Sequence, residues 1–150
     1  MKIDVEAIKK LREATGAGVA DCRMALEQSK GDAKKATEIL RKKGIEKADK
    51  KSDRQVKAGM VFTYAHHTGR VGVILALACE TDFVAKTDDF QNLGRELALH
   101  VCASTPSNVE ELLKQEYVRD PSKTIENLIK EVIGKLGENI QVLEFKVVKV

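Results

Sequence analysis

The sequence lacks any apolar run that approaches the ~20 residues of a membrane-spanning helix. Its most apolar stretch, residues 71–79, has nine positions without a charged side chain. The first six residues, Met1–Glu6, also lack the apolar stretch of a signal peptide. We therefore expect a cytoplasmic protein that has no membrane partner.

Cysteine is scarce as well. Cys22, Cys79 and Cys102 lie far apart in the chain, are odd in number and form no C-x-x-C pair. This pattern indicates neither a disulfide framework nor a zinc site. Each thiol is expected to be a small buried apolar group, and a regulatory or intersubunit disulfide stays open as the alternative.

Motifs for catalysis and cofactor binding are missing. The glycine-rich residues 15–18 lack both the preceding strand and the G-K-[ST] ending of a phosphate loop, so they are expected to serve turns and helix caps. His66 and His67 point to opposite sides if they lie on a strand, and His100 is on a distant helix. Asp88-Asp89 is expected to favour a helix N-terminus and not to form an acid/base pair. We expect neither an enzyme nor a bound cofactor or metal.

Aromatic residues are absent from residues 1–58, although this part of the chain is basic, with 16 Lys/Arg against 10 Asp/Glu. A basic surface suits an acidic partner or a phosphate backbone. The alternative function is therefore a protein- or nucleic-acid-binding module that uses the basic N-terminal helices. Mixed charges and the lack of a ring for base stacking disfavour direct nucleic-acid binding.

Residues 1–45 predict a small three-helix bundle. Apolar residues recur at helical spacing, Asp4 and Asp32 are good N-caps, and Gly44 is expected to close the third helix. Residues 46–58 are strongly charged and are expected to be a linker, helical or not, to a second module. The helices are expected over residues 4–14, 19–29 and 33–44.

Residues 59–150 predict a core of the α+β class, with a three-stranded antiparallel sheet covered by helices. Strand formers and turn residues give strands over residues 59–67, 71–79 and 140–150, the last at an edge or paired with a second subunit. Helical spacing gives helices over residues 88–103, 107–118 and 124–136. Thr87 or Asp88 is expected to cap the first of these helices.

Two local details of this core are also predicted. Ser107 and Glu110 match a capping box that opens the short helix. In the last strand Leu143, Phe145 and Val147 are expected to face the same way, although the neighbouring valines complicate strict alternation.

The stretch Cys79–Lys86 connects the most apolar strand to the helix that follows it. It places Phe83, one of four phenylalanines, beside an acid in a short connection of the kind that carries function. A large ring on an anchored loop suits insertion into a partner's pocket. The alternative is that Phe83 folds back and fills the core.

Three segments resemble a known family. Residues 11–26, Leu-Arg-Glu-Ala-Thr-Gly-Ala-Gly-Val-Ala-Asp-Cys-Arg-Met-Ala-Leu, are similar to the N-terminal signature of bacterial translation elongation factor Ts. Residues 79–86, Cys-Glu-Thr-Asp-Phe-Val-Ala-Lys, are similar to its second signature, and residues 67–73 resemble its core hairpin. Two long motifs in the family's order are specific, and the resemblance covers nearly the whole chain.

The resemblance implies a ubiquitin-associated-like (UBA-like) helical module, a linker and an α+β dimerisation core. It also implies a guanine nucleotide exchange factor for the GTPase elongation factor Tu. In the family, the segment that matches Thr81, Asp82, Phe83 and Val84 disturbs the magnesium and phosphate site of that GTPase. Arg12, Val19 and Ala20 match contact positions of the N-terminal module.

The resemblance further implies the short, single-core form of the family. Single-core relatives form homodimers through their sheets, so a homodimer and a 2:2 complex with elongation factor Tu are expected. Two departures stand out. Val19-Ala20 is smaller than the side chains common there, and the segment between Tyr117 and Pro121 is shorter than usual.

Overall fold

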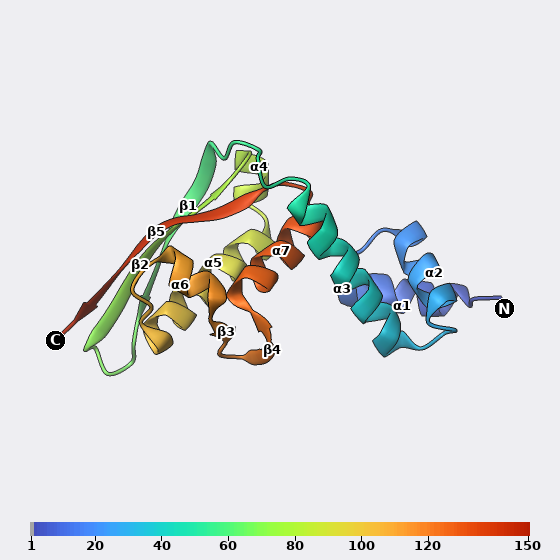
Figure 1. Cartoon of the computed structure of the whole chain (residues 1–150), viewed down its shortest axis with the longest axis horizontal. Coiled ribbons are helices and arrows are strands. Elements are labelled where there is room, and N and C mark those ends of the chain that lie inside the picture. The colour runs from blue at the N-terminus through green and yellow to red at the C-terminus, as the bar shows by residue number, and fades with distance from the viewer. Residues whose placement is uncertain (1) are drawn as a thin grey trace.

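The computed structural model describes residues 2–150 and is elongated, with the two termini at opposite ends (Figure 1). The helices are α1 (Val5–Thr15), α2 (Val19–Gln28), α3 (Ala33–Asp49), α4 (Asp82–Ala85), α5 (Asp88–Ser104), α6 (Val109–Lys114) and α7 (Ile125–Leu136). The strands are β1 (Ala58–Ala65), β2 (Val71–Cys79), β3 (Glu116–Tyr117), β4 (Asp120–Thr124) and β5 (Ile140–Lys149). None of the described helices is long and apolar enough to cross a membrane.

Side-chain caps begin α1 and α3 where the sequence predicts them. Asp4 accepts a hydrogen bond from the Glu6 N–H at 3.2 Å, and Asp32 accepts one from the Lys34 N–H at 3.0 Å. Such caps satisfy backbone donors that a helix leaves unpaired. The three N-terminal helices enclose a small core of their own, and their prediction is confirmed. That core consists of Leu11, Cys22, Ala25, Leu26, Ala36 and Leu40.

Helix α3 does not end at Gly44 as predicted but continues to Asp49, into the segment expected to be a linker. Gly44 instead lies at a close crossing of α3 and α7, because a Cβ added at Gly134 would lie 2.6 Å from the Gly44 Cα atom. Beyond this crossing Ala48 is buried in the larger core. The prediction was wrong because a glycine that permits close packing looks in sequence like one that ends a helix.

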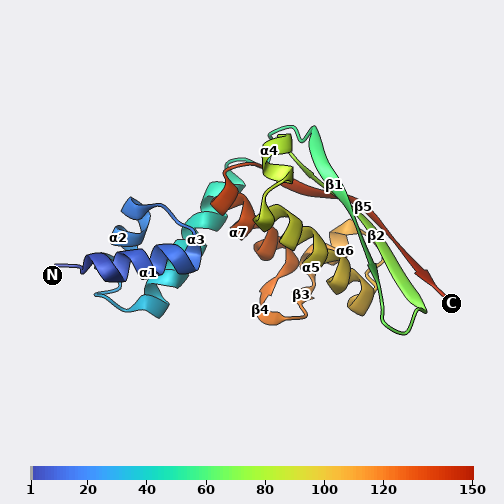
Figure 2. The ribbon, with the colours of Figure 1, turned by 180° about the vertical axis from the view of Figure 1, so that it is seen from behind.

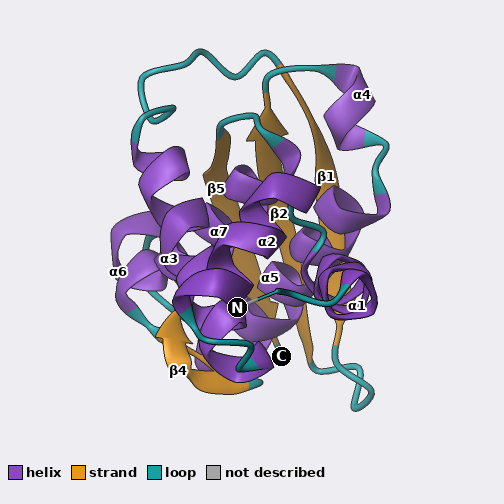
Figure 3. Cartoon of the chain, turned by 90° about the vertical axis from the view of Figure 1, so that its right-hand side faces the viewer, coloured by secondary structure: helices purple, strands orange, loops and turns teal. Residues whose placement is uncertain are grey.

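The larger core is built on the antiparallel sheet β1-β2-β5, in which β2 is central and β5 lies at an edge. Leu75 of β2 lies opposite both Phe62 and Phe145 and is fully buried. Its neighbour Ile74 points to the other face and is 48% exposed. Helices cover only one face of this sheet, as Figures 2 and 3 show. The predicted three-stranded sheet is confirmed.

A β-bulge in β5 overturns one predicted orientation. Glu144 lies opposite Ala76 while Val142 lies opposite Leu77, so Leu143 is an extra residue in its strand. A bulge shifts side-chain alternation by one position. Leu143 is therefore 57% exposed and does not share the buried side of the strand with Phe145, as had been predicted.

The segment between α5 and α7 also differs from the prediction. Helix α6 is capped by Asn108, whose side chain accepts the Glu111 N–H at 2.8 Å, and not by Ser107. It ends at Lys114, and the small hairpin β3–β4 follows where the sequence indicated only the end of a helix and a break. Tyr117 explains the change, because its buried ring brings its hydroxyl within 2.5 Å of Glu96 on α5.

Candidate partner-binding site

The loop after β2 contains the one-turn helix α4 and leads into α5, and a threonine side chain caps each of these helices. Thr81 caps α4 and accepts the Val84 N–H at 3.4 Å. Thr87 caps α5, accepts the Phe90 N–H at 3.3 Å and donates its hydroxyl to the Val84 carbonyl at 2.7 Å. The sequence predicted a cap at Thr87 or Asp88, and the structure places it at Thr87.

Phe83 projects from this loop into solvent. Its side chain is 87% exposed and Asp82 is exposed beside it, whereas Val84 and Ala85 are buried in the core. The buried pair holds α4 against the sheet, so the ring is presented and does not fill the core. Of the two interpretations that the sequence left open, the structure supports the exposed one.

Two glutamates tie this loop to the connection between α7 and β5. The Glu138 carboxylate accepts the Thr81 N–H at 3.0 Å and the Thr81 hydroxyl at 2.7 Å. The Glu80 carboxylate accepts the Asn139 N–H at 2.8 Å, and the Asn139 side chain donates to the Arg54 carbonyl at 2.8 Å. The sequence analysis missed these contacts because they join residues more than 50 positions apart and follow no local pattern.

Cys79 lies beneath the loop as a buried thiol. Its Sγ atom donates to the Thr81 carbonyl at 3.2 Å. Burial, and next the nearby Glu138 carboxylate, raises the pKa of the Cys79 thiol. The thiol is therefore protonated at neutral pH and is a poor nucleophile. All three cysteines are buried and free, as predicted.

The predicted N-terminal contact residues lie on a separate surface. Arg12, Val19 and Ala20 are exposed around the turn between α1 and α2, with Val19 53% exposed. Figure 1 shows α4 beside the sheet and the first two helices toward the opposite end of the molecule. The two predicted sets of residues thus lie on separate surfaces of the molecule.

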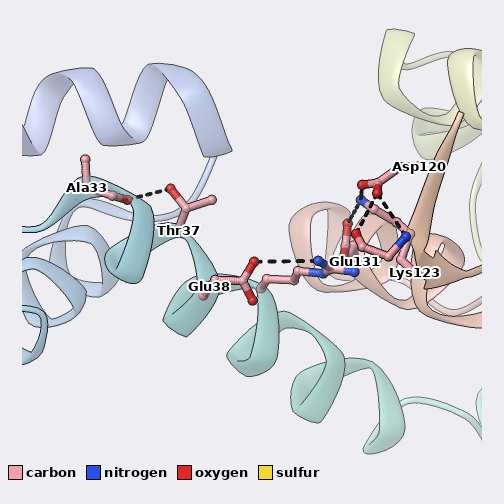
Figure 4. A network of polar contacts seen from close by, with 8 residues as sticks. Ala33, Thr37, Glu38, Asp120, Lys123 and Glu131 are labelled. Carbon is pink, nitrogen blue, oxygen red and sulfur yellow. Dashed lines mark hydrogen bonds and ion pairs between the residues drawn. The ribbon is translucent and has the colours of Figure 1, made fainter.

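Ion pairs connect the helices that separate these two surfaces. Arg41 on α3 pairs with Glu38 at 3.7 Å and with Glu131 on α7. Glu131 also pairs with Lys123 at 2.9 Å, and Lys123 pairs with Asp120 at 3.8 Å (Figure 4). Arg41 and Glu131 are mostly buried, so solvent screens their attraction less than it screens exposed pairs. The network runs from the N-terminal bundle to the β3–β4 hairpin.

The histidines do not form a metal site. His66 and His67 follow β1 in the turn, and their ring centroids are 4.1 Å apart. The strand expected over residues 59–67 ends at Ala65, so the two histidines do not lie on a strand and the condition for their pointing to opposite sides is not met. Among residues 2–150 no group of three metal-ligating side chains is close enough to hold an ion.

Proteins similar to this chain match it over nearly its whole length. The sequence model of the family described as Elongation factor TS matches residues 80–150, which begin at the exposed loop. The elongation factor Ts of Fervidobacterium nodosum is 40% identical, over 97% of this chain and 96% of its own length. The chain belongs to the elongation factor Ts family.

Other elongation factors Ts have longer chains or longer alignments than the 150 residues of this chain. The factor of Thermotoga maritima is also 40% identical, but its alignment spans 188 positions, against the 150 residues of this chain. The factor of Aquifex aeolicus is 42% identical over 97% of this chain, which covers only 52% of that relative. These relatives are all translation elongation factors Ts, and this chain is one too.

Proposed function

We propose that this elongation factor Ts acts in the cytoplasm on elongation factor Tu, as its guanine nucleotide exchange factor, through the loop that presents Phe83. The observation that carries the proposal is a large ring that is 87% exposed on a loop tied down on both sides. An exposed ring on a rigid mount loses little conformational freedom on binding, which favours its use as an anchor.

The proposed mechanism is displacement of the metal that holds GDP. Thr81–Val84 enters the GTPase near its switch helices, where Phe83 acts as a wedge and Asp82 supplies charge and hydrogen bonding. Bound magnesium neutralises phosphate charge, so disturbing it weakens GDP binding. Because coupling is reciprocal, a factor that prefers nucleotide-free elongation factor Tu must lower the affinity for GDP by the same ratio.

A second contact is proposed for the N-terminal module, residues 1–45, which we propose to be UBA-like. Arg12, Val19 and Ala20 would dock on the nucleotide-binding domain of elongation factor Tu. The segment 46–58 links this module to the core, residues 59–150, which carries the loop. Two separated contacts on one rigid partner would fix the angle at which Phe83 approaches.

A homodimer is proposed to form through the uncovered face of the sheet, giving a 2:2 complex with elongation factor Tu. That face exposes large apolar side chains from all three strands, among them Val61 at 60%, Ile74 at 48% and Val148 at 66%. Contiguous exposed apolar groups of this kind mark an interaction surface.

The test is release of fluorescent GDP from elongation factor Tu in the presence of magnesium. The parent should accelerate release strongly, and the Asp82→Ala/Phe83→Ala variant should lose about 30-fold, as expected for an anchor worth about 2 kcal/mol. Val118→Ala is a matched control, since Val118 is an exposed apolar residue on the β3–β4 hairpin. Because Phe83 is exposed, the double variant should unfold within about 0.5 kcal/mol of the parent.

A folded parent that does not accelerate release would overturn the exchange function. The binding-module alternative would then come first, and its affinity should fall steeply with salt. The structure gives this alternative little support, because Lys43 and Lys47 are both paired with Asp21, at 2.5 and 3.0 Å. Accordingly, no direct nucleic-acid binding is proposed.

A further inference from the structure

Helix α4, which carries Phe83, has only four residues, Asp82–Ala85. A helix of one turn has no stability of its own, because nucleation costs more than one turn of hydrogen bonds returns. The direction in which Phe83 points must therefore be set by the groups that hold the ends of α4. Its C-terminal end is held by Thr87, and its N-terminal end depends on Thr81.

Both hydrogen-bond donors of Thr81 are held by one carboxylate. Glu138 accepts both the N–H and the hydroxyl of Thr81, at 3.0 and 2.7 Å. A hydroxyl rotates freely until its proton is committed to an acceptor. Donation to Glu138 commits that proton and leaves an oxygen lone pair for the Val84 N–H, 3.4 Å away. The Glu138 carboxylate thus fixes the rotation of the Thr81 hydroxyl as well as the position of Thr81.

We infer that Glu138 is a positioning residue for nucleotide exchange, which fixes the direction of Phe83 by holding Thr81. Both of its hydrogen bonds are charge-assisted, and such bonds are about twice as strong as neutral ones. Glu138 touches neither nucleotide nor magnesium in this role, so it acts only through the loop.

The neighbours of Glu138 link the loop after β2 and the α7–β5 connection in both directions. Gly137 ends α7 in a left-handed conformation with φ 78°, which turns the chain so that Glu138 faces the loop. On the other side Glu80 accepts the Asn139 N–H at 2.8 Å, so each connection supplies a carboxylate to the other. Arg54 lies 3.6 Å from Glu80 and partly balances the two negative charges.

This inference rests on the proposed exchange function, and three variants test it. Glu138→Ala removes both bonds to Thr81. Glu138→Gln can keep both, since its carbonyl accepts the Thr81 N–H and its amide donates to the Thr81 oxygen. Glu110→Ala is the control, because Glu110 is an exposed carboxylate on α6 that pairs only with Lys114, one turn away. GDP release and amide hydrogen exchange are measured for each.

Glu138→Ala should slow assisted GDP release about tenfold, as expected when a reacting group is misplaced by a fraction of an ångström. Glu138→Gln should restore most of the rate, and Glu110→Ala should match the parent. Amide hydrogen exchange of residues 81–85 should speed up in Glu138→Ala, while the amides of β2 stay protected. In an Asp82→Ala/Phe83→Ala background, Glu138→Ala should slow release no further, because neither of the side chains that α4 presents is left to direct.

Different results separate the two proposals. A parent that does not accelerate GDP release from elongation factor Tu overturns the exchange function. Unchanged amide hydrogen exchange at residues 81–85 in Glu138→Ala overturns the proposal that Glu138 holds Thr81, whether or not the parent accelerates release. A parent that is active while Glu138→Ala matches it overturns the positioning role. So does a further loss in the Asp82→Ala/Phe83→Ala background, which would show that Glu138 acts on exchange independently of these two side chains.

Discussion

At the scale of single residues, His100 shows how a buried polar group fixes its own protonation state. The backbone N–H of Val118 can only donate, and it lies 3.3 Å from Nδ1 of His100, so this nitrogen must be the acceptor. The ring proton is then on Nε2, which donates to the Gln115 side-chain oxygen at 2.9 Å. Burial lowers the pKa of His100, and the bond to Gln115 opposes this in part. A neutral ring therefore holds the β3–β4 hairpin to α5.

Stability should fall when His100 is forced to take up a second proton. Its pKa in the folded state is below the ordinary value of 6.5, so the unfolded chain binds the proton first as the pH falls. The contribution of His100 is therefore constant above pH 6.5 and turns against folding as the pH falls below that value. Urea unfolding between pH 8 and pH 5 measures it.

The variant His100→Gln isolates this effect, because every other titratable residue is the same in both proteins. The free energy of unfolding should fall more steeply below pH 6.5 in the parent than in His100→Gln. Parallel curves would show that His100 does not titrate differently in the two states.

At the scale of elements, the crossing of α3 and α7 is asymmetric. A Cβ added at Gly134 would lie 2.6 Å from both the Cα and the carbonyl oxygen of Gly44. A Cβ added at Gly44 would have only the Gly134 Cα nearby, at an ordinary 4.0 Å. The backbone of α3 therefore occupies the place of a side chain on α7, and the reverse is not true.

This asymmetry predicts opposite effects for the same substitution. Gly134→Ala should destabilise the protein by about 1–3 kcal/mol, because the helices must move apart. Gly44→Ala should be neutral or should stabilise by up to about 1 kcal/mol through helix propensity. Urea unfolding of both variants checks this, and equal effects would contradict the observed crossing.

How far the sequence predicted each element depended on the range of the contacts involved. The caps at Asp4, Asp32 and Thr87 are satisfied within three residues, so local pattern was enough to find them. The role of Gly44 and the bond between Thr81 and Glu138 depend on segments that meet only after folding.

The candidate site was predicted in identity more than in geometry. The sequence placed Phe83 in a strand-to-helix connection. A single aromatic residue in a short connection, however, forms no periodic pattern that would show whether it is buried or exposed. Only the burial of its neighbours Val84 and Ala85 decides that it points outward. The sequence did not indicate the bulge at Leu143 either. One extra residue reverses which side chains of β5 face the core, and the sequence of the strand does not show where that residue lies.

At the scale of the whole molecule, the sheet has one helix-covered face and one free face. Its two edge strands, β1 and β5, each pair with β2 on one side and with no other described strand on the outer side. The free face has only a few charged residues, among them Glu144 and Lys146 of β5. The proposed homodimer would bury this apolar face against the same face of a second copy, as a twofold interface does.

A charge on the central strand should disrupt the proposed dimer. Ile74→Glu would replace an apolar side chain in the middle of the free face by a carboxylate, whose burial against a second copy is costly even beside Lys146, the residue opposite it in β5. Sedimentation velocity should show a dimer for the parent and a monomer for Ile74→Glu. Val118→Glu, at an exposed site on the β3–β4 hairpin, should stay dimeric. A parent that sediments as a monomer at micromolar concentration would contradict the proposal.

The position of β2 has a mechanical consequence for the loop that follows it. Among the strands of the sheet, β2 alone is hydrogen-bonded on both sides, and it ends at Cys79, four residues before Phe83. A load applied to the ring therefore passes into the stiffest strand and is shared between two ladders of hydrogen bonds. This protein therefore deforms little when the ring presses against a partner, and most of the deformation is expected in the partner.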